Sequence, residues 1–89
     1  MNKLEQARIK IDDIDRQMAE LFKLRMQTVQ DVLSYKKDNH LPVLDTKRES
    51  SMIERNVSRF DSKELELYYV QFLKSILEIS RKFQEDHYE

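Results

Sequence analysis

The sequence has no cysteine, no glycine and no tryptophan, and it has only one proline. Without cysteine, the chain can form neither a disulfide framework nor a zinc site built on thiolates. Without glycine, it lacks the phosphate-binding loop of P-loop ATPases and the dinucleotide fingerprint of Rossmann enzymes, and tight β-turns become rare. These absences disfavour nucleotide-binding enzymes and β-barrels, and they favour an all-helical protein.

The length of 89 residues predicts a single domain spanning residues 1–89. The 16 lysines and arginines are interleaved with 17 acidic residues, which argues against a nucleic-acid partner because such a surface needs clustered positive charge. No apolar run exceeds four residues, so we expect no membrane span and no signal-peptide core. The two histidines stand alone and do not suggest a metal site. We therefore expect a cytoplasmic protein.

An apolar stripe at helical spacing predicts one continuous helix over residues 3–38. Such a helix spans roughly 54 Å, whereas a compact chain of this size has a diameter of roughly 30 Å. Two shorter helices cannot cover the whole stripe, so we expect a two-fold homodimer with antiparallel long helices. The alternative is a helix that breaks near its middle and folds back, although no glycine or proline marks a break. The stripe comprises Leu4, Ala7, Ile11, Ile14, Met18, Leu21, Arg25, Thr28, Val32 and Tyr35.

Two shorter helices follow a proline-containing loop at residues 38–44. The first begins at Asp45 or Thr46, where residues 46–49 fit a capping box, and a second such box at 61–64 opens the last helix. The predicted fold is thus an all-α, three-helix chain that forms an intertwined antiparallel homodimeric bundle. The expected inward residues are Met52, Ile53, Val57 and Phe60, then Leu65, Tyr69, Phe72, Ile76, Ile79 and Phe83, with Leu73, Leu77, Ser80 and Gln84 in a neighbouring row.

Three cations lie on or beside the apolar stripe of the long helix: Arg8, Arg25 and Lys36. Taken alone, Arg25 could simply pair with an acidic residue of another helix, since a buried arginine is costly without a partner. Arg25 and Lys36 are separated by about 16 Å of helical rise, which two long side chains can bridge toward a ligand. Arg8 is about 25 Å from Arg25 and can approach it only from a second, antiparallel chain. The spacing therefore predicts an anion-binding pocket shared by two chains.

Polar residues on the other two helices are candidates for the same pocket. Ser80 and Gln84 are four residues apart and continue an apolar row, so they point to one interior space. Asp45, Arg48 and Glu49 open the second helix, where helix-start amides suit an anionic or hydroxylic ligand. Capping is an alternative explanation for Asp45 and Glu49.

In order and spacing, these residues resemble the all-helical, AroQ-type chorismate mutases. The resemblance covers nearly the whole chain, and its most specific element is the D-x-x-R-E pattern before the second helix. The matching segments are Arg8 with Ile11-Asp12-Asp13-Ile14-Asp15, Leu21-Phe22-Lys23-Leu24-Arg25, Lys36, Pro42-Val43-Leu44-Asp45-Thr46-Lys47-Arg48-Glu49, and Ser80-Arg81-Lys82-Phe83-Gln84.

The resemblance implies a role for each candidate residue in binding chorismate. Arg25 and the Arg8 of the second chain would bind the two carboxylates, and Ser80 would contact a carboxylate. Lys36 would hydrogen-bond the ether oxygen whose bond breaks and would also touch a carboxylate. Gln84 would donate a second hydrogen bond to that oxygen, and as an amide it donates at neutral pH without titrating.

The ring hydroxyl of chorismate would lie near Glu49 and Asp45, which Arg48 would orient. The implied reaction is the pericyclic rearrangement of chorismate to prephenate in phenylalanine and tyrosine biosynthesis, which needs no metal, nucleophile or cofactor. Two alternatives stay open: an isochorismate-pyruvate lyase of the same fold, and a non-catalytic helical dimerisation or regulatory module. Mutase domains of this kind also occur fused to other enzymes, whereas the polar, frayed end expected at residues 87–89 suits a free-standing protein.

Overall fold

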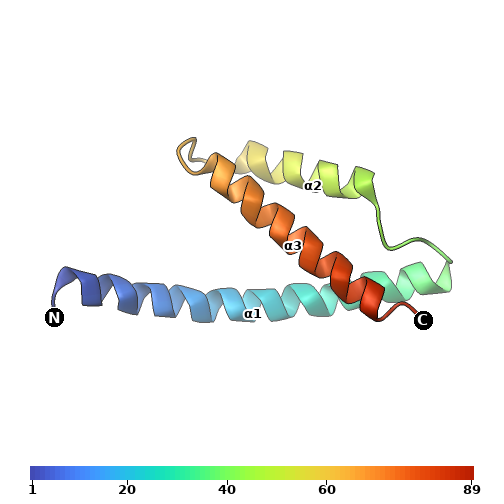
Figure 1. Ribbon diagram of the computed structural model, residues 1–89, viewed down its shortest axis with the longest axis horizontal. Helices are drawn as coiled ribbons and strands as arrows, with labels where there is room; N and C mark the ends of the chain where they lie inside the picture. Colours follow the sequence, from blue (N-terminus) through green and yellow to red (C-terminus); the bar gives the residue numbers. More distant parts are fainter.

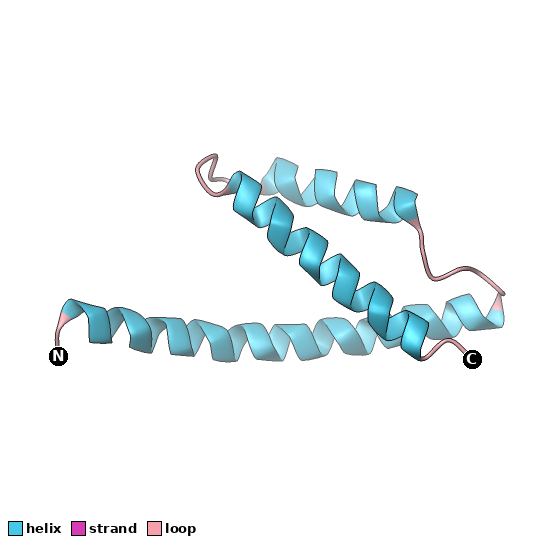
Figure 2. Cartoon of the chain, viewed as in Figure 1, coloured by secondary structure: helices cyan, strands magenta, loops and turns pink.

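The computed structural model describes residues 1–89 and contains three helices and no strand. These are α1 (Lys3–Asp38), α2 (Thr46–Arg59) and α3 (Glu66–Asp86). Helix α1 runs without a break along the full length of a molecule that measures 55 × 25 × 16 Å, and α2 and α3 lie to one side of it (Figures 1 and 2). The predicted continuous helix over 3–38 is confirmed, and the alternative of a broken, folded-back helix is wrong.

Short-range hydrogen bonds fix both ends of α1. The Asn2 side chain accepts from the Glu5 amide at 2.8 Å, which caps the N-terminus. At the other end, the amides of His40 and Leu41 donate to the carbonyls of Lys37 and Lys36, in the pattern of a Schellman motif. His40 has a left-handed backbone conformation (φ 53°) at the position that glycine usually occupies in this motif. The chain contains no glycine.

Helix α2 begins at Thr46, within the range predicted, but its cap differs from the predicted capping box. Asp45 is the N-cap, and its carboxylate accepts from the Arg48 amide at 3.0 Å. Aspartate at this position leaves no capping role for Thr46, and Glu49 lies one residue beyond the position that a capping box requires. The carboxylate of Glu49 is therefore free for another partner.

Helix α3 begins at Glu66, later than the predicted box at residues 61–64. The Ser62 hydroxyl accepts from the Leu65 amide at 3.3 Å, so the polar residues form a turn that precedes the helix. Local side-chain bonds of this kind compete with helix formation, which explains why the box signal did not start the helix.

Helix α3 packs against both α1 and α2, as Figure 1 shows, and the core lies along it. Leu33 of α1, Met52 of α2 and Leu73 of α3 are the buried apolar side chains. The expected burial of α3 is only partly correct: Leu73, Ser80 and Gln84 of the neighbouring row are buried, whereas the main row is half-buried or exposed. The exposed members of that main row are Leu65, Phe72 and Ile79.

The first 24 residues are all exposed, although the stripe that they carry is apolar. Leu4, Ile11, Ile14, Met18 and Leu21 each expose between 45 and 66% of their surface. Helix α3 crosses α1 near the C-terminal end of α1, away from its first turns (Figure 1). None of the three helices is both long and apolar enough to cross a lipid bilayer.

The C-terminal residues contact the body of the chain, contrary to the expectation of a frayed end. The Tyr88 hydroxyl donates to the Leu41 carbonyl at 2.6 Å, and the His87 ring stacks on Phe83 with centroids 4.3 Å apart. These contacts tie the end of α3 to the loop between α1 and α2.

Candidate functional site

Seven of the eight predicted site residues line one small cavity. It lies between the C-terminal part of α1, the start of α2 and the C-terminal part of α3, and its volume is about 130 Å³. Apolar side chains, among them Val29 and Leu77, form the rest of its wall. The seven predicted residues are Arg25, Lys36, Asp45, Arg48, Glu49, Ser80 and Gln84.

Lys36 is anchored at both its backbone and its side chain. Its carbonyl accepts from the Leu41 amide in the cap of α1, and its ammonium donates to the Val43 carbonyl at 2.7 Å and to Gln84 Oε1 at 2.8 Å. An ammonium has three N–H donors, and no other acceptor of the chain takes the third. The nitrogen is thus fixed in position while it keeps one donor for a ligand.

The contact with Lys36 also sets the orientation of the buried Gln84 amide. Because an ammonium only donates, the amide oxygen must face Lys36 and the amide nitrogen must face away from it. That nitrogen donates to the Ser80 carbonyl at 3.3 Å, which uses one of its two N–H groups. Gln84 therefore keeps a second N–H, which does not titrate near neutral pH.

Arg25 contacts a hydroxyl instead of the acidic residue that an isolated buried arginine would need. Its Nη1 donates to Ser80 Oγ at 2.6 Å, and that hydroxyl donates to the Ile76 carbonyl at 2.8 Å. No carboxylate lies within ion-pair distance of Arg25. Burial lowers the pKa of its guanidinium below the ordinary value, and the positive charge of Arg48 lowers it further. An anion bound in the cavity would offset both effects, because an opposite charge nearby favours the charged guanidinium.

The start of α2 supplies two carboxylates to the same wall. One carboxylate oxygen of Asp45 accepts the capping hydrogen bond, as the capping interpretation requires. Glu49 makes no capping bond, and its Oε2 lies 3.3 Å from Nε of Arg81 on α3. Capping therefore accounts for Asp45 and does not account for Glu49.

Arg81 is a lining residue that the sequence reasoning did not identify as part of the site. The sequence already places Arg81 near the site, because it lies between Ser80 and Gln84 and is three residues before Gln84 on the same helix. With it, the wall carries four cations against the carboxylates of Asp45 and Glu49, an excess of two positive charges. This balance matches a ligand with two negative charges.

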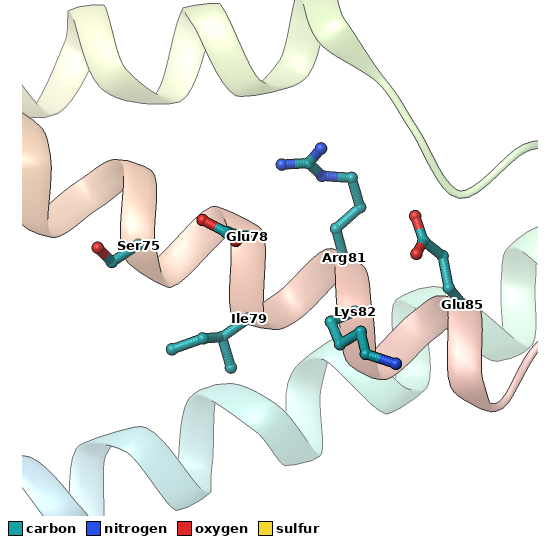
Figure 3. A pocket seen from close by; sticks show the side chains of 6 residues that line it. All are labelled: Ser75, Glu78, Ile79, Arg81, Lys82 and Glu85. Carbon is teal, nitrogen blue, oxygen red and sulfur yellow. The ribbon is translucent and has the colours of Figure 1, made fainter.

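A larger hollow of about 620 Å³ lies along α3, but it is open and contains none of the predicted residues. Figure 3 shows its lining, which comes from α3 alone and includes Glu78, Lys82 and Glu85. A groove beside one helix cannot surround a small ligand, so the smaller cavity is the better candidate.

Comparison with protein families decides what kind of protein carries this cavity. A family model described as chorismate mutase type II matches residues 7–85. The chain belongs to this family. The matched range contains every residue of the cavity as well as Arg8. A search of curated proteins and a search of solved structures found no significant match.

One predicted residue of the chorismate mutase site, Arg8, lies apart from the cavity. It is exposed in the second turn of α1, and its side chain makes no hydrogen bond or ion pair within the chain. The residues of α1 that line the cavity run from Arg25 to Lys36, in the C-terminal half of the long helix. The chain also has no group of three or more His, Cys, Asp or Glu side chains that could hold a metal ion.

Proposed function

We propose that this member of the chorismate mutase type II family converts chorismate to prephenate in phenylalanine and tyrosine biosynthesis, as a single cytoplasmic domain. One observation carries the proposal: Arg25 and Lys36 are half-buried in a shared cavity, and neither has a carboxylate partner in the chain. Two unpaired cations are costly for a helical module that binds nothing. A dianionic substrate such as chorismate would compensate both.

The proposed mechanism requires no covalent intermediate, because the rearrangement breaks and forms bonds within one molecule. Arg25 and Ser80 would hold a carboxylate of the substrate and so fix the compact conformer in which the reacting carbons meet. Negative charge grows on the ether oxygen as its bond to the ring breaks. The remaining N–H donors of Lys36 and Gln84 would meet that charge with groups already fixed in position.

The hydroxyl of the substrate ring would bind at the start of α2. Glu49 would accept from it, and the second oxygen of Asp45 is a further acceptor beside it. Arg48 lines the cavity between these two residues in the sequence and would orient their carboxylates once substrate is bound. These contacts would set the ring's direction in the cavity, so that the ether oxygen faces Lys36 and Gln84.

We also propose that the active form is a homodimer with antiparallel α1 helices. The exposed apolar stripe of residues 3–24 would pack against the same helix of a second chain, forming an intertwined bundle. In this arrangement Arg8 of one chain would reach the cavity of the other and bind the second carboxylate. The open side of the cavity, whose wall here comes from one chain, would be closed by the partner's helix.

The direct test follows the loss of chorismate's ultraviolet absorbance on adding purified protein and identifies the product. Prephenate formation without pyruvate is the expected result. Release of pyruvate from isochorismate would assign the chain to the lyase of the same fold instead. No turnover of either substrate by a well-folded protein would contradict the proposal and favour the non-catalytic module.

A further inference from the structure

Arg81 lies at the cavity without a role in the proposed mechanism. Its guanidinium reaches from α3 toward α2 (Figure 3), whereas the neighbouring Lys82 is exposed and pairs with Asp86 on α3 itself. Arg81 makes no hydrogen bond within the chain, and its one ionic contact is the 3.3 Å approach of Nε to Glu49 Oε2. Nε is buried there, although the pair is not aligned as a hydrogen bond.

We infer that Arg81 is a positioning residue that holds the Glu49 carboxylate at the cavity for the ring hydroxyl of the substrate. The inference rests on the proposed function, because it assigns Glu49 the substrate hydroxyl as its partner. Arg81 acts from the opposite helix and touches the carboxylate through Nε, so the terminal nitrogens and the second carboxylate oxygen keep hydrogen-bonding capacity.

The physical reason is the conformational freedom of a glutamate side chain. The Glu49 carboxylate forms no hydrogen bond with its own helix, so only the pair with Arg81 restrains it before substrate binds. Its nearest cation on the same helix, Arg48, is exposed and is also the neighbour that repels Arg25. If the carboxylate is already in place when substrate binds, the entropic cost of ordering the side chain is not added to the reaction barrier.

A purely structural role for the pair predicts different behaviour. Arg81 and Glu49 join α3 to α2, and both side chains are about one-third exposed or less, at 32 and 26%. If the pair only ties these helices together, its loss lowers the melting temperature and leaves the kinetics of the folded protein unchanged. If Arg81 instead binds substrate directly, its loss reduces activity whether or not Glu49 is present.

A double-mutant cycle on the full chain separates these roles. We would measure kcat and KM for chorismate in the unmodified protein, Arg81→Gln, Glu49→Gln and the double variant, together with thermal melts. We expect Arg81→Gln to lower kcat/KM about fivefold, consistent with loss of a partly exposed charge pair that orients a substrate ligand. In the Glu49→Gln background the same change should have almost no effect.

Two further variants serve as controls. Arg81→Lys keeps the positive charge and should retain more than half of the activity, which a defect of packing alone would not permit. Lys82→Gln removes the same charge from the adjacent residue, which does not line the cavity and pairs with Asp86 at 2.6 Å. Its kcat/KM should stay within about twofold of the unmodified value, because exposed i,i+4 pairs contribute little.

The outcomes keep this inference distinct from the proposed function. Unmodified protein without mutase activity would refute the proposed function itself. An active protein whose kcat/KM is unchanged by Arg81→Gln would overturn only the role of Arg81. A fivefold loss that persists in the Glu49→Gln background would overturn it as well, because Arg81 would then act on substrate and not through Glu49.

Discussion

The two parts of α1 differ in how much of their surface is buried within a single chain. In the C-terminal part, residues 25–38, Leu33 is buried to 3% exposure, and Arg25 and Lys36 contact residues of α3. In the N-terminal part, residues 3–24, every residue is exposed, including the members of the apolar stripe. One end of the helix thus lines the chain's own cavity, and the other end carries the apolar surface that we propose for dimerisation. The following experiments test that division.

The largest effect is expected from a change in the C-terminal part. Lys36→Ala removes a fixed donor from the proposed ether-oxygen position and should lower kcat by roughly 10²- to 10³-fold. The circular dichroism spectrum and the oligomeric state should not change. Lys37→Ala is the matched control, because it removes the same charge one residue away and outside the cavity. Normal turnover by a folded Lys36→Ala variant would contradict the role assigned to this residue.

A charge in the N-terminal part should act on association instead. Ile14→Asp places one carboxylate per chain in the middle of the exposed apolar stripe, so a two-fold dimer would bury two. We expect the dissociation constant of the dimer, measured by sedimentation, to rise about a hundredfold. Gln27→Asp adds the same charge on the opposite side of α1 and should leave association nearly unchanged. A monomeric unmodified protein would refute the dimer directly.

A smaller but more specific signal should come from mixing two inactive variants. Arg8→Gln and Arg25→Gln should each lose most activity, because each removes a carboxylate ligand from every site. Random exchange of their chains would make half of the dimers mixed, and each mixed dimer would contain one intact site. The mixture should therefore recover about one quarter of the unmodified activity. No recovery after verified chain exchange would show that Arg8 and Arg25 do not form a shared site.

The sequence predicted those elements that are marked by a long apolar periodicity or by a helix-breaking residue. The uninterrupted periodicity from Leu4 to Tyr35 gave the length of α1, and the single proline marked the loop that follows it. Arg25, Ser80 and Gln84 were identifiable because a polar side chain inside an apolar row is conspicuous, whereas the residues at the start of α2 were identified from the helix start and the family pattern. Family resemblance then related positions that lie far apart in the chain.

Features decided by competing local bonds or by packing were harder to predict. The start of α3 depended on whether Ser62 would begin a helix or close a turn, and both use the same residue types. Which of two adjacent rows on α3 would be buried depended on the angle at which it crosses α1. The position of Arg81 near Gln84 was visible in the sequence, but its pairing with Glu49 was not, because Glu49 lies on another helix and no spacing along the chain relates the two.

The unbroken course of α1 also limits how proteins of this shape can change in length. One inserted residue between Arg8 and Arg25 would shift one relative to the other by 1.5 Å and rotate it by about 100° around the helix. No loop lies between these residues to absorb the change, whereas residues 39–45 form a loop where insertions are better tolerated. The long helix therefore fixes the distance and the angle between Arg8 and Arg25, and so between the two active sites of the proposed dimer. Natural insertions and deletions are expected in the loops and to be rejected between Arg8 and Arg25.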